Sequence, residues 1–219
     1  MSNPYFQFKQ FTVWHDKCAM KVGTDGVLLG AWTSVQGAHS ILDVGTGTGL
    51  VALMLAQRSL PNTNIVALEI DEAAAEQAKE NIVRSPWKKQ IEVVQTDFRK
   101  YQSPEKFDVI VSNPPYFVDS LGCPDQQRNS ARHNDSLTYE ELLEGVTGLL
   151  TENGTFTIVI PMDVADRVKM IASEKKLQAV RQLNVITKPG GIPKRTLITF
   201  SFSNQECIVE ELLTEVARH

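Results

Sequence analysis

Apolar, β-branched runs alternate with helix-forming stretches from Ile41 onward. This alternation is typical of successive strand–helix–strand units, in which neighbouring strands are parallel and helices cover the sheet. We therefore predict an α/β fold. Strands are predicted at Ser40–Val44, Asn64–Glu69, Ile91–Val94, Phe107–Val111 and Gly154–Ile160.

Polar residues mark where several helices begin. Asp71 precedes an alanine-rich stretch and is suited to cap a helix there. Thr138 and Glu141 have the spacing of a capping box, which predicts a helix from that point to about Leu150. Asp163 is expected to cap a later, more charged helix.

The C-terminal part of the chain predicts a different strand arrangement. A sixth strand is expected near Val180–Thr187 and a seventh at Arg195–Phe202, joined by the turn Lys188–Lys194. That turn is too short for a crossover helix, so the two strands should form an antiparallel hairpin. The expected architecture is a mostly parallel, seven-stranded sheet that ends in this hairpin.

The length of 219 residues fits a single domain, with an N-terminal extension at 1–39, a core at 40–203 and a tail at 204–219. Hydrophobic residues make up 42% and charged residues 22%, as in a globular protein. No apolar stretch approaches the ~18 residues of a membrane span. Three widely spaced cysteines, Cys18, Cys123 and Cys207, do not suit a disulfide framework. We expect a soluble, cytoplasmic protein with no membrane partner.

A glycine-rich turn, Asp43-Val44-Gly45-Thr46-Gly47-Thr48-Gly49, follows the first predicted strand. Glycines let the backbone approach a ligand closely, and the free N–H groups of the next helix favour an anionic group. Dinucleotide-binding turns have the spacing G-x-G-x-x-G, whereas the third glycine here comes one residue early. The spacing therefore argues against a nicotinamide cofactor.

Acidic residues end the next two strands. Glu69 lies where an acid accepts hydrogen bonds from ribose hydroxyls, and Asp97 could accept one from an adenine amino group. The simpler interpretation of Asp97 alone is a turn residue. Because the carboxyl ends of parallel strands meet at one crevice, Asp43, Glu69 and Asp97 are predicted to face a single ligand site.

The most specific motif is Asn113-Pro114-Pro115-Tyr116, directly after the fourth predicted strand. The two prolines restrict the backbone and lack N–H donors, so the asparagine side chain and the nearby carbonyls form a rigid row of acceptors. Such a row suits a planar NH2 group. Tyr116 offers a face on which an extruded base could stack.

Together, the glycine-rich turn and Asn113–Tyr116 resemble class I methyltransferases that use S-adenosylmethionine to modify planar amino or amide nitrogens. The segments Phe8–Val13 and His15–Trp32, with Ser85-Pro86-Trp87 and Cys123-Pro124, are similar to the bacterial tRNA1(Val) (adenine(37)-N6)-methyltransferases. The resemblance covers nearly the whole chain. It implies a Rossmann-like methyltransferase fold and methylation of an adenine N6 beside the anticodon of a tRNA.

The resemblance also implies roles for individual residues. The target adenine would be held by Asn113–Tyr116. The cofactor would be bound by Thr24, Asp25, Asp43, Gly45, Gly47, Gly49, Glu69 and Asp97. For Thr24 and Asp25, capping of a helix at Gly26–Trp32 is an alternative that does not exclude cofactor contact.

A net charge of −4 means that an RNA partner has to be bound by a local basic patch. Candidate phosphate contacts are Lys9, Lys17, Lys21, Arg128, Arg132, Lys188, Lys194 and Arg195. For each of them, solvated surface charge is the alternative. His15 and Cys18 lack a second ligand pair, so no metal is expected.

Other functions remain open at this point. A methyltransferase acting on a glutamine amide of a release factor would use the same acceptor row, although such enzymes usually carry a larger N-terminal domain. A non-catalytic RNA-binding module and an oxidoreductase are the further alternatives.

Overall fold

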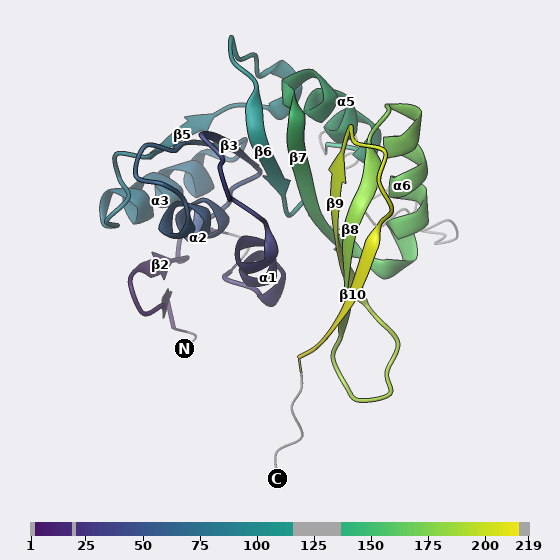
Figure 1. The fold of residues 1–219 in the computed structure, drawn as a ribbon. Coiled ribbons are helices and arrows are strands. Elements are labelled where there is room, and N and C mark those ends of the chain that lie inside the picture. Colours follow the sequence, from purple (N-terminus) through teal and green to yellow (C-terminus); the bar gives the residue numbers. More distant parts are fainter. Residues whose placement is uncertain (1–2, 19–20, 116–136, 215–219) are drawn as a thin grey trace, which may run out of the picture.

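A computed structural model of the chain describes residues 3–18, 21–115 and 137–214. The strands of its main sheet are β3 (Ser40–Val44), β4 (Asn64–Glu69), β5 (Ile91–Gln95), β6 (Phe107–Ser112), β7 (Leu150–Pro161), β8 (Gln178–Ile186), β9 (Arg195–Ser201) and β10 (Ile208–Leu213). Within the described ranges these eight strands lie in the order β10-β8-β9-β7-β6-β3-β4-β5 (Figure 1). Strands β5, β4, β3, β6 and β7 pair in parallel, and β9 is antiparallel to both β7 and β8. The predicted α/β fold and the antiparallel C-terminal hairpin are confirmed.

Helices cover both faces of this sheet. The helices α1 (Thr24–Trp32), α2 (Leu50–Arg58) and α3 (Glu72–Val83) lie on one face, and α5 (Tyr139–Leu149) and α6 (Ala165–Glu174) lie on the other (Figure 1). Successive strand residues point to opposite faces. Accordingly, Ile41 packs in the core under α1–α3, whereas Leu42 packs in the core under α5 and α6.

Local capping signals fix the beginnings of two helices as predicted. The Asp71 carboxylate accepts a hydrogen bond from the Ala74 N–H (2.8 Å) and caps α3. The Thr138 hydroxyl accepts from the Glu141 N–H (3.1 Å), and the Glu141 carboxylate accepts from the Thr138 N–H (2.8 Å). This reciprocal capping box begins α5.

Three predictions about elements are wrong. The sheet has an eighth strand, because Ile208–Leu213, predicted as part of a tail, forms β10 and pairs in parallel with β8. Asp163 lies within a short 3-10 helix, η2 (Met162–Val164), and the cap residue of α6 is Val164. The cap residue of α1 is Gly23, so Thr24 and Asp25 lie in the first turn of that helix.

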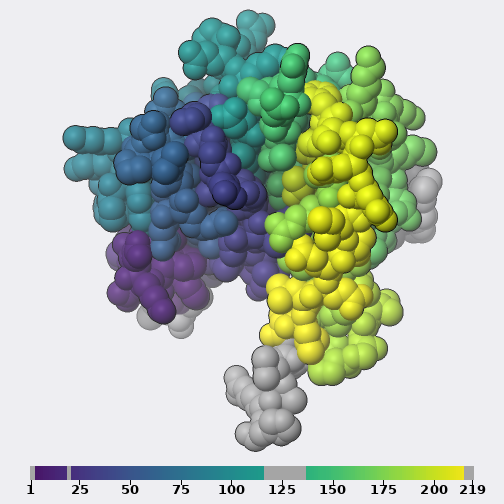
Figure 2. Space-filling view, in the orientation of Figure 1, coloured from purple at the N-terminus to yellow at the C-terminus, as the bar shows by residue number. Residues whose placement is uncertain are grey.

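The N-terminal extension contains a small antiparallel hairpin of β1 (Tyr5–Gln7) and β2 (Thr12–Trp14), which the sequence patterns did not predict. It joins the body through Phe11 and Val13, which are buried in the core under α1–α3. In Figure 2 the surface is recessed between the N-terminal part of the chain (purple) and the ends of β8 and β10 (green to yellow). None of the helices in the described ranges has the length and apolar composition that a membrane crossing requires.

Candidate functional site

The glycine-rich turn between β3 and α2 adopts a conformation that needs glycine. Gly45, Gly47 and Gly49 have φ angles of 74°, 56° and 81°, in the left-handed region that other residues rarely adopt. Apart from the glycine itself and its two chain neighbours, no heavy atom of the described residues lies within 4 Å of a Cβ built at Gly45 or Gly47. At Gly49 the same Cβ would meet the Ala78 Cβ at 3.4 Å. The turn therefore packs on α3 at Gly49 and has open space beside Gly45 and Gly47.

Glu69, the last residue of β4, holds this turn in place. One carboxylate oxygen accepts the Gly47 N–H (2.8 Å). The other accepts the N–H groups of Ile70 (2.9 Å) and Asp71 (3.0 Å). The side chain is 9% exposed. Glu69 thus joins the glycine-rich turn to the start of α3 through charge-assisted hydrogen bonds to the main chain.

Asp43 supports the turn from below. It is buried, and its carboxyl accepts a hydrogen bond from the Thr46 hydroxyl (2.6 Å). Burial raises the pKa of this carboxyl to about 7, against the lowering effect of its hydrogen bonds from Thr46 and the Ala52 N–H. Neither Asp43 nor Gly49 lines the two cavities described below, so both act on the turn itself.

Asp97 follows β5 and is held by a neighbour in sequence. Its carboxylate accepts hydrogen bonds from the Arg99 guanidinium, the shortest at 2.7 Å, and from the Arg99 N–H (3.0 Å). The hydrogen bond from the Arg99 side chain lowers the pKa of the Asp97 carboxyl. Arg99 also pairs with Glu141 of the capping box (3.7 Å). Asp97 is therefore both a turn residue, at the start of η1 (Phe98–Lys100), and part of a cavity wall.

A first cavity of about 300 Å³ lies at the carboxyl ends of β3, β4 and β5. The predicted residues Gly45, Gly47, Glu69, Asp97 and Asn113 line it. Residues that sequence reasoning missed also line it: Cys18, Ile70, Phe98, Arg99 and Leu137. The sequence contained a signal for Ile70, because it is an apolar residue directly after the acid that ends β4. In the structure Ile70 is 57% exposed.

A second cavity of about 520 Å³ adjoins the first and shares Gly45, Gly47 and the segment Asn113–Pro115 with it. Thr24, Asp25, Thr48, Lys21, Lys194 and Arg195 are among the other polar residues that line it. Asn113 and Pro114 thus line both of two adjoining cavities. The first has Glu69 and Asp97 in its wall, and the second has Lys21, Lys194 and Arg195. Tyr116 lies outside the described residues.

The predicted basic patch divides into three groups. Lys21, Lys194 and Arg195 line the second cavity, where Arg195 pairs with Asp25 at 3.2 Å. Lys9 and Lys188 are exposed. Lys17 pairs with Glu80 (2.8 Å) and Glu76 (3.4 Å) on α3 instead of facing either cavity. Arg128 and Arg132 lie outside the described residues.

His15 and Cys18 have separate surroundings. The His15 Nε2 lies 2.9 Å from the Asn3 carbonyl oxygen, and Cys18 lines the first cavity. Burial, reinforced by Glu69 and Asp71, raises the pKa of the Cys18 thiol to about 11. In the described ranges, no group of three or more His, Cys, Asp or Glu side chains is placed to hold a metal ion.

The fold corresponds to a known class. The family model of the methyltransferase small domain matches residues 22–187. A predicted O-methyltransferase from Agrobacterium tumefaciens is similar in structure, with a TM-score of 0.69, 18% identity and 90% of each chain covered. A putative RNA methyltransferase from Pyrococcus horikoshii has a TM-score of 0.58, with 17% identity over 81% of this chain and 79% of that one. These matches define a methyltransferase fold.

Two relatives narrow the class. The tRNA1(Val) (adenine(37)-N6)-methyltransferase of Bacteroides thetaiotaomicron is 81% identical over all of this chain and 92% of its own length. The protein of the same name from Phocaeicola vulgatus is 52% identical over all of this chain and 93% of its own length. The chain belongs to this family of tRNA1(Val) (adenine(37)-N6)-methyltransferases.

Proposed function

We propose that the protein transfers a methyl group from S-adenosylmethionine to the exocyclic N6 of adenine 37, beside the anticodon of tRNA1(Val). The observation that carries the proposal is that Asn113–Pro115 line both of two adjoining cavities. In the proposal the first cavity would hold the methyl donor and the second would admit the acceptor. The names of the close relatives supply the acceptor's identity. With tRNA as its substrate, the protein would work in the cytoplasm.

The first cavity fits the nucleoside part of the cofactor. The open space beside Gly45 and Gly47 is a cradle that any side chain would fill. Glu69 would bind the ribose hydroxyls and Asp97 the adenine amino group, with Ile70 and Phe98 as apolar walls for the base. Thr24 and Asp25 line the second cavity and would contact the part of the cofactor that lies farthest from its adenine. When bound, S-adenosylmethionine supplies an electrophilic methyl group on a positively charged sulfur.

The chain's own residues orient the acceptor. The Asn113 side-chain oxygen and the neighbouring carbonyls would accept hydrogen bonds from the adenine NH2 group, which directs its nitrogen toward the donor. Pro114 is buried and restricts the backbone, so this row does not have to be ordered during the reaction. Stacking of the base on Tyr116 stays part of the proposal. No strong general base is required, because an alkylated amine readily loses its proton.

RNA phosphates would be bound beside the second cavity by Lys21, Lys194 and Arg195, with Lys9, Arg128 and Arg132 as further contacts. We leave Lys17 out of this patch, because it is already paired with two glutamates. A small patch is sufficient because an anticodon loop presents unpaired bases that can be extruded and read individually.

The test is a methylation assay on defined acceptors. Purified protein is incubated with labelled methyl donor and tRNA lacking the modification, and the RNA is digested to nucleosides. We expect labelled N6-methyladenosine from tRNA1(Val), and none from a transcript in which adenine 37 is replaced by guanine. Label in a release-factor glutamine, with none in tRNA, would overturn the proposal.

A further inference from the structure

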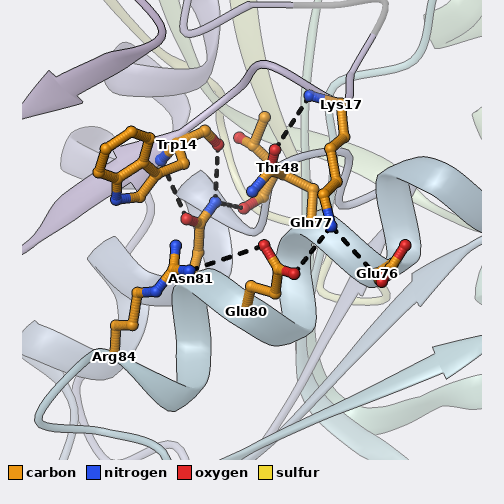
Figure 3. Close-up of polar contacts among 8 residues, drawn as sticks. All are labelled: Trp14, Lys17, Thr48, Glu76, Gln77, Glu80, Asn81 and Arg84. Atoms are coloured by element: carbon orange, nitrogen blue, oxygen red, sulfur yellow. Dashed lines mark hydrogen bonds and ion pairs between the residues drawn. The ribbon is translucent and has the colours of Figure 1, made fainter.

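Two buried amide side chains on α3 face the N-terminal segment. Gln77 and Asn81 are one helical turn apart, and each is 1% exposed. Figure 3 shows the Asn81 side chain pointing toward Trp14 at the end of β2, and the Gln77 side chain pointing toward Lys17, in the chain that follows β2. A buried amide without partners destabilises a protein, so the bonds that these two groups make are informative.

Asn81 joins two segments that are distant in sequence. Its side-chain oxygen accepts the Trp14 N–H (2.9 Å), while its NH2 group donates to the carbonyls of Trp14 (2.8 Å) and Thr48 (2.9 Å) (Figure 3). Trp14 ends β2, and Thr48 lies between Gly47 and Gly49 in the glycine-rich turn. One side chain therefore binds the N-terminal segment and the turn together.

The turn is held from two sides. Glu69 binds the Gly47 N–H, and Asn81 binds the Thr48 carbonyl one residue later. Glu69 lines the first cavity, whereas Asn81 lines neither cavity. Loss of Asn81 would remove the side-chain hydrogen bond to the Thr48 carbonyl, while the first half of the turn would keep its bonds through Thr46 and Gly47.

Gln77 makes a simpler connection. Its side-chain oxygen accepts the Lys17 N–H (3.1 Å), next to the ion pairs of Lys17 with Glu76 and Glu80 (Figure 3). The chain continues from Lys17 to Cys18, which lines the first cavity, and Lys21 lines the second. Gln77 thus holds the N-terminal segment from the same helix face as Asn81, and this makes it a matched control for Asn81.

We propose that Asn81 is a positioning residue for methyl transfer: it sets the glycine-rich turn through Thr48 and ties the N-terminal segment to it. This inference rests on the proposed function, because the turn matters through the cofactor it would hold. Gln77, in contrast, positions only the N-terminal segment and not the glycine-rich turn.

The experiment compares Asn81→Asp with Gln77→Met. Aspartate keeps the shape and the acceptor for Trp14, but it has no NH2 group and replaces at most one of the two donor bonds. Methionine keeps the length of Gln77 and removes the acceptor for Lys17. Asn81→Ala, which adds no charge, is included as a second variant. Thermal unfolding verifies that each variant is folded, and calorimetry with S-adenosylhomocysteine measures cofactor-site affinity without RNA.

We expect both Asn81 variants to bind S-adenosylhomocysteine about 3- to 10-fold more weakly, as loss of a net hydrogen bond predicts. Gln77→Met should stay within about twofold of wild type. In the methylation assay, Asn81→Asp should raise the half-saturating cofactor concentration with little change in turnover at saturation.

Wild-type affinity in a folded Asn81 variant would overturn the inference. Equal weakening by Gln77→Met would also overturn it, because a general loosening of α3 would then explain both results. Absence of binding by the wild-type protein itself is a distinct result, which would refute the proposed function and this inference with it.

Discussion

The two cavities share a wall but hold their polar groups in different ways. In the first, Glu69 is fixed by three main-chain N–H groups and Asp97 by an arginine two residues away. In the second, Arg195 on β9 reaches Asp25 on α1 across 170 positions of sequence. Most of the hydrogen bonds that fix the two acids of the first cavity come from residues one or two positions away, whereas the ion pair of the second cavity joins distant elements.

This difference leads us to expect separate roles for the two cavities, one in cofactor binding and the other in RNA binding. In the proposed function, charge-assisted hydrogen bonds would hold the acids of the first cavity in place for a constant ligand, the cofactor. The cations of the second cavity are on long side chains that can rearrange around RNA phosphates. Substitutions in the first cavity should therefore act on cofactor affinity, and substitutions in the second on RNA affinity.

The largest effect is expected at the shared wall. Asn113→Ala should slow single-turnover methyl transfer by about 100-fold or more, because a preorganised group that orients the reacting nitrogen is lost. Affinity for S-adenosylhomocysteine should change only a few-fold. Asn64→Ala makes the same change at the opposite end of the sheet and serves as the control. Near-normal transfer by Asn113→Ala would refute the acceptor row.

In the first cavity, Glu69→Gln should weaken S-adenosylhomocysteine binding by about 10- to 100-fold. The amide cannot accept all three main-chain hydrogen bonds and offers a poorer acceptor to ribose hydroxyls, and hydrogen bonds to charged groups are worth about 1.5–3 kcal/mol. Calorimetry measures the change, with the exposed Glu72→Gln as the control. Unchanged affinity would remove Glu69 from the cofactor site.

The raised pKa of Asp43, which lies beneath the glycine-rich turn, predicts that the free energy of unfolding depends on pH. Its folded-state pKa of about 7 lies above the ordinary value near 3.9, so the folded protein retains a proton that the unfolded chain releases. The stability from this proton is present below about pH 4 and is lost as the pH rises toward 7, by up to about 1.4 kcal/mol per pH unit.

The amide introduced by Asp43→Asn does not titrate, so this variant should gain free energy of unfolding relative to wild type between pH 5 and pH 7. Urea denaturation of both proteins across this range measures the difference. A constant difference would mean that the Asp43 carboxyl is already ionised in the folded protein.

The smallest effect is expected in the second cavity. Arg195→Ala should raise the half-saturating tRNA concentration by about 3- to 10-fold and reduce the salt dependence by about one phosphate contact. Filter binding at several salt concentrations measures both. Arg167→Ala, which removes the same charge from α6 on the other face of the sheet, should leave them unchanged. Loss of cofactor binding in Arg195→Ala would show that its pair with Asp25 serves the fold of α1.

Much of the fold was predictable because its signals are local. Strands β3 and β4 have the predicted bounds, and the capping box at Thr138 begins α5 as expected. Of the three acids predicted to face a single ligand site, Glu69 and Asp97 line the first cavity, whereas Asp43 is buried beneath the turn and lines neither cavity. Parallel strand topology and a short turn leave little freedom in where those side chains lie.

The features that could be learned only from the tertiary structure, such as β10 and the hydrogen bonds of Asn81, depend on contacts between distant segments. The sequence Ile208–Leu213 lacks a period-two pattern, and it becomes β10 because β8 offers a free edge and Arg181 pairs with Glu210 at 2.7 Å. The bonds of Asn81 to Trp14 and Thr48 span 67 and 33 positions. Local sequence patterns predicted most of the helices and strands, but they do not encode which distant edges and side chains meet, because that is settled by packing of the assembled layers.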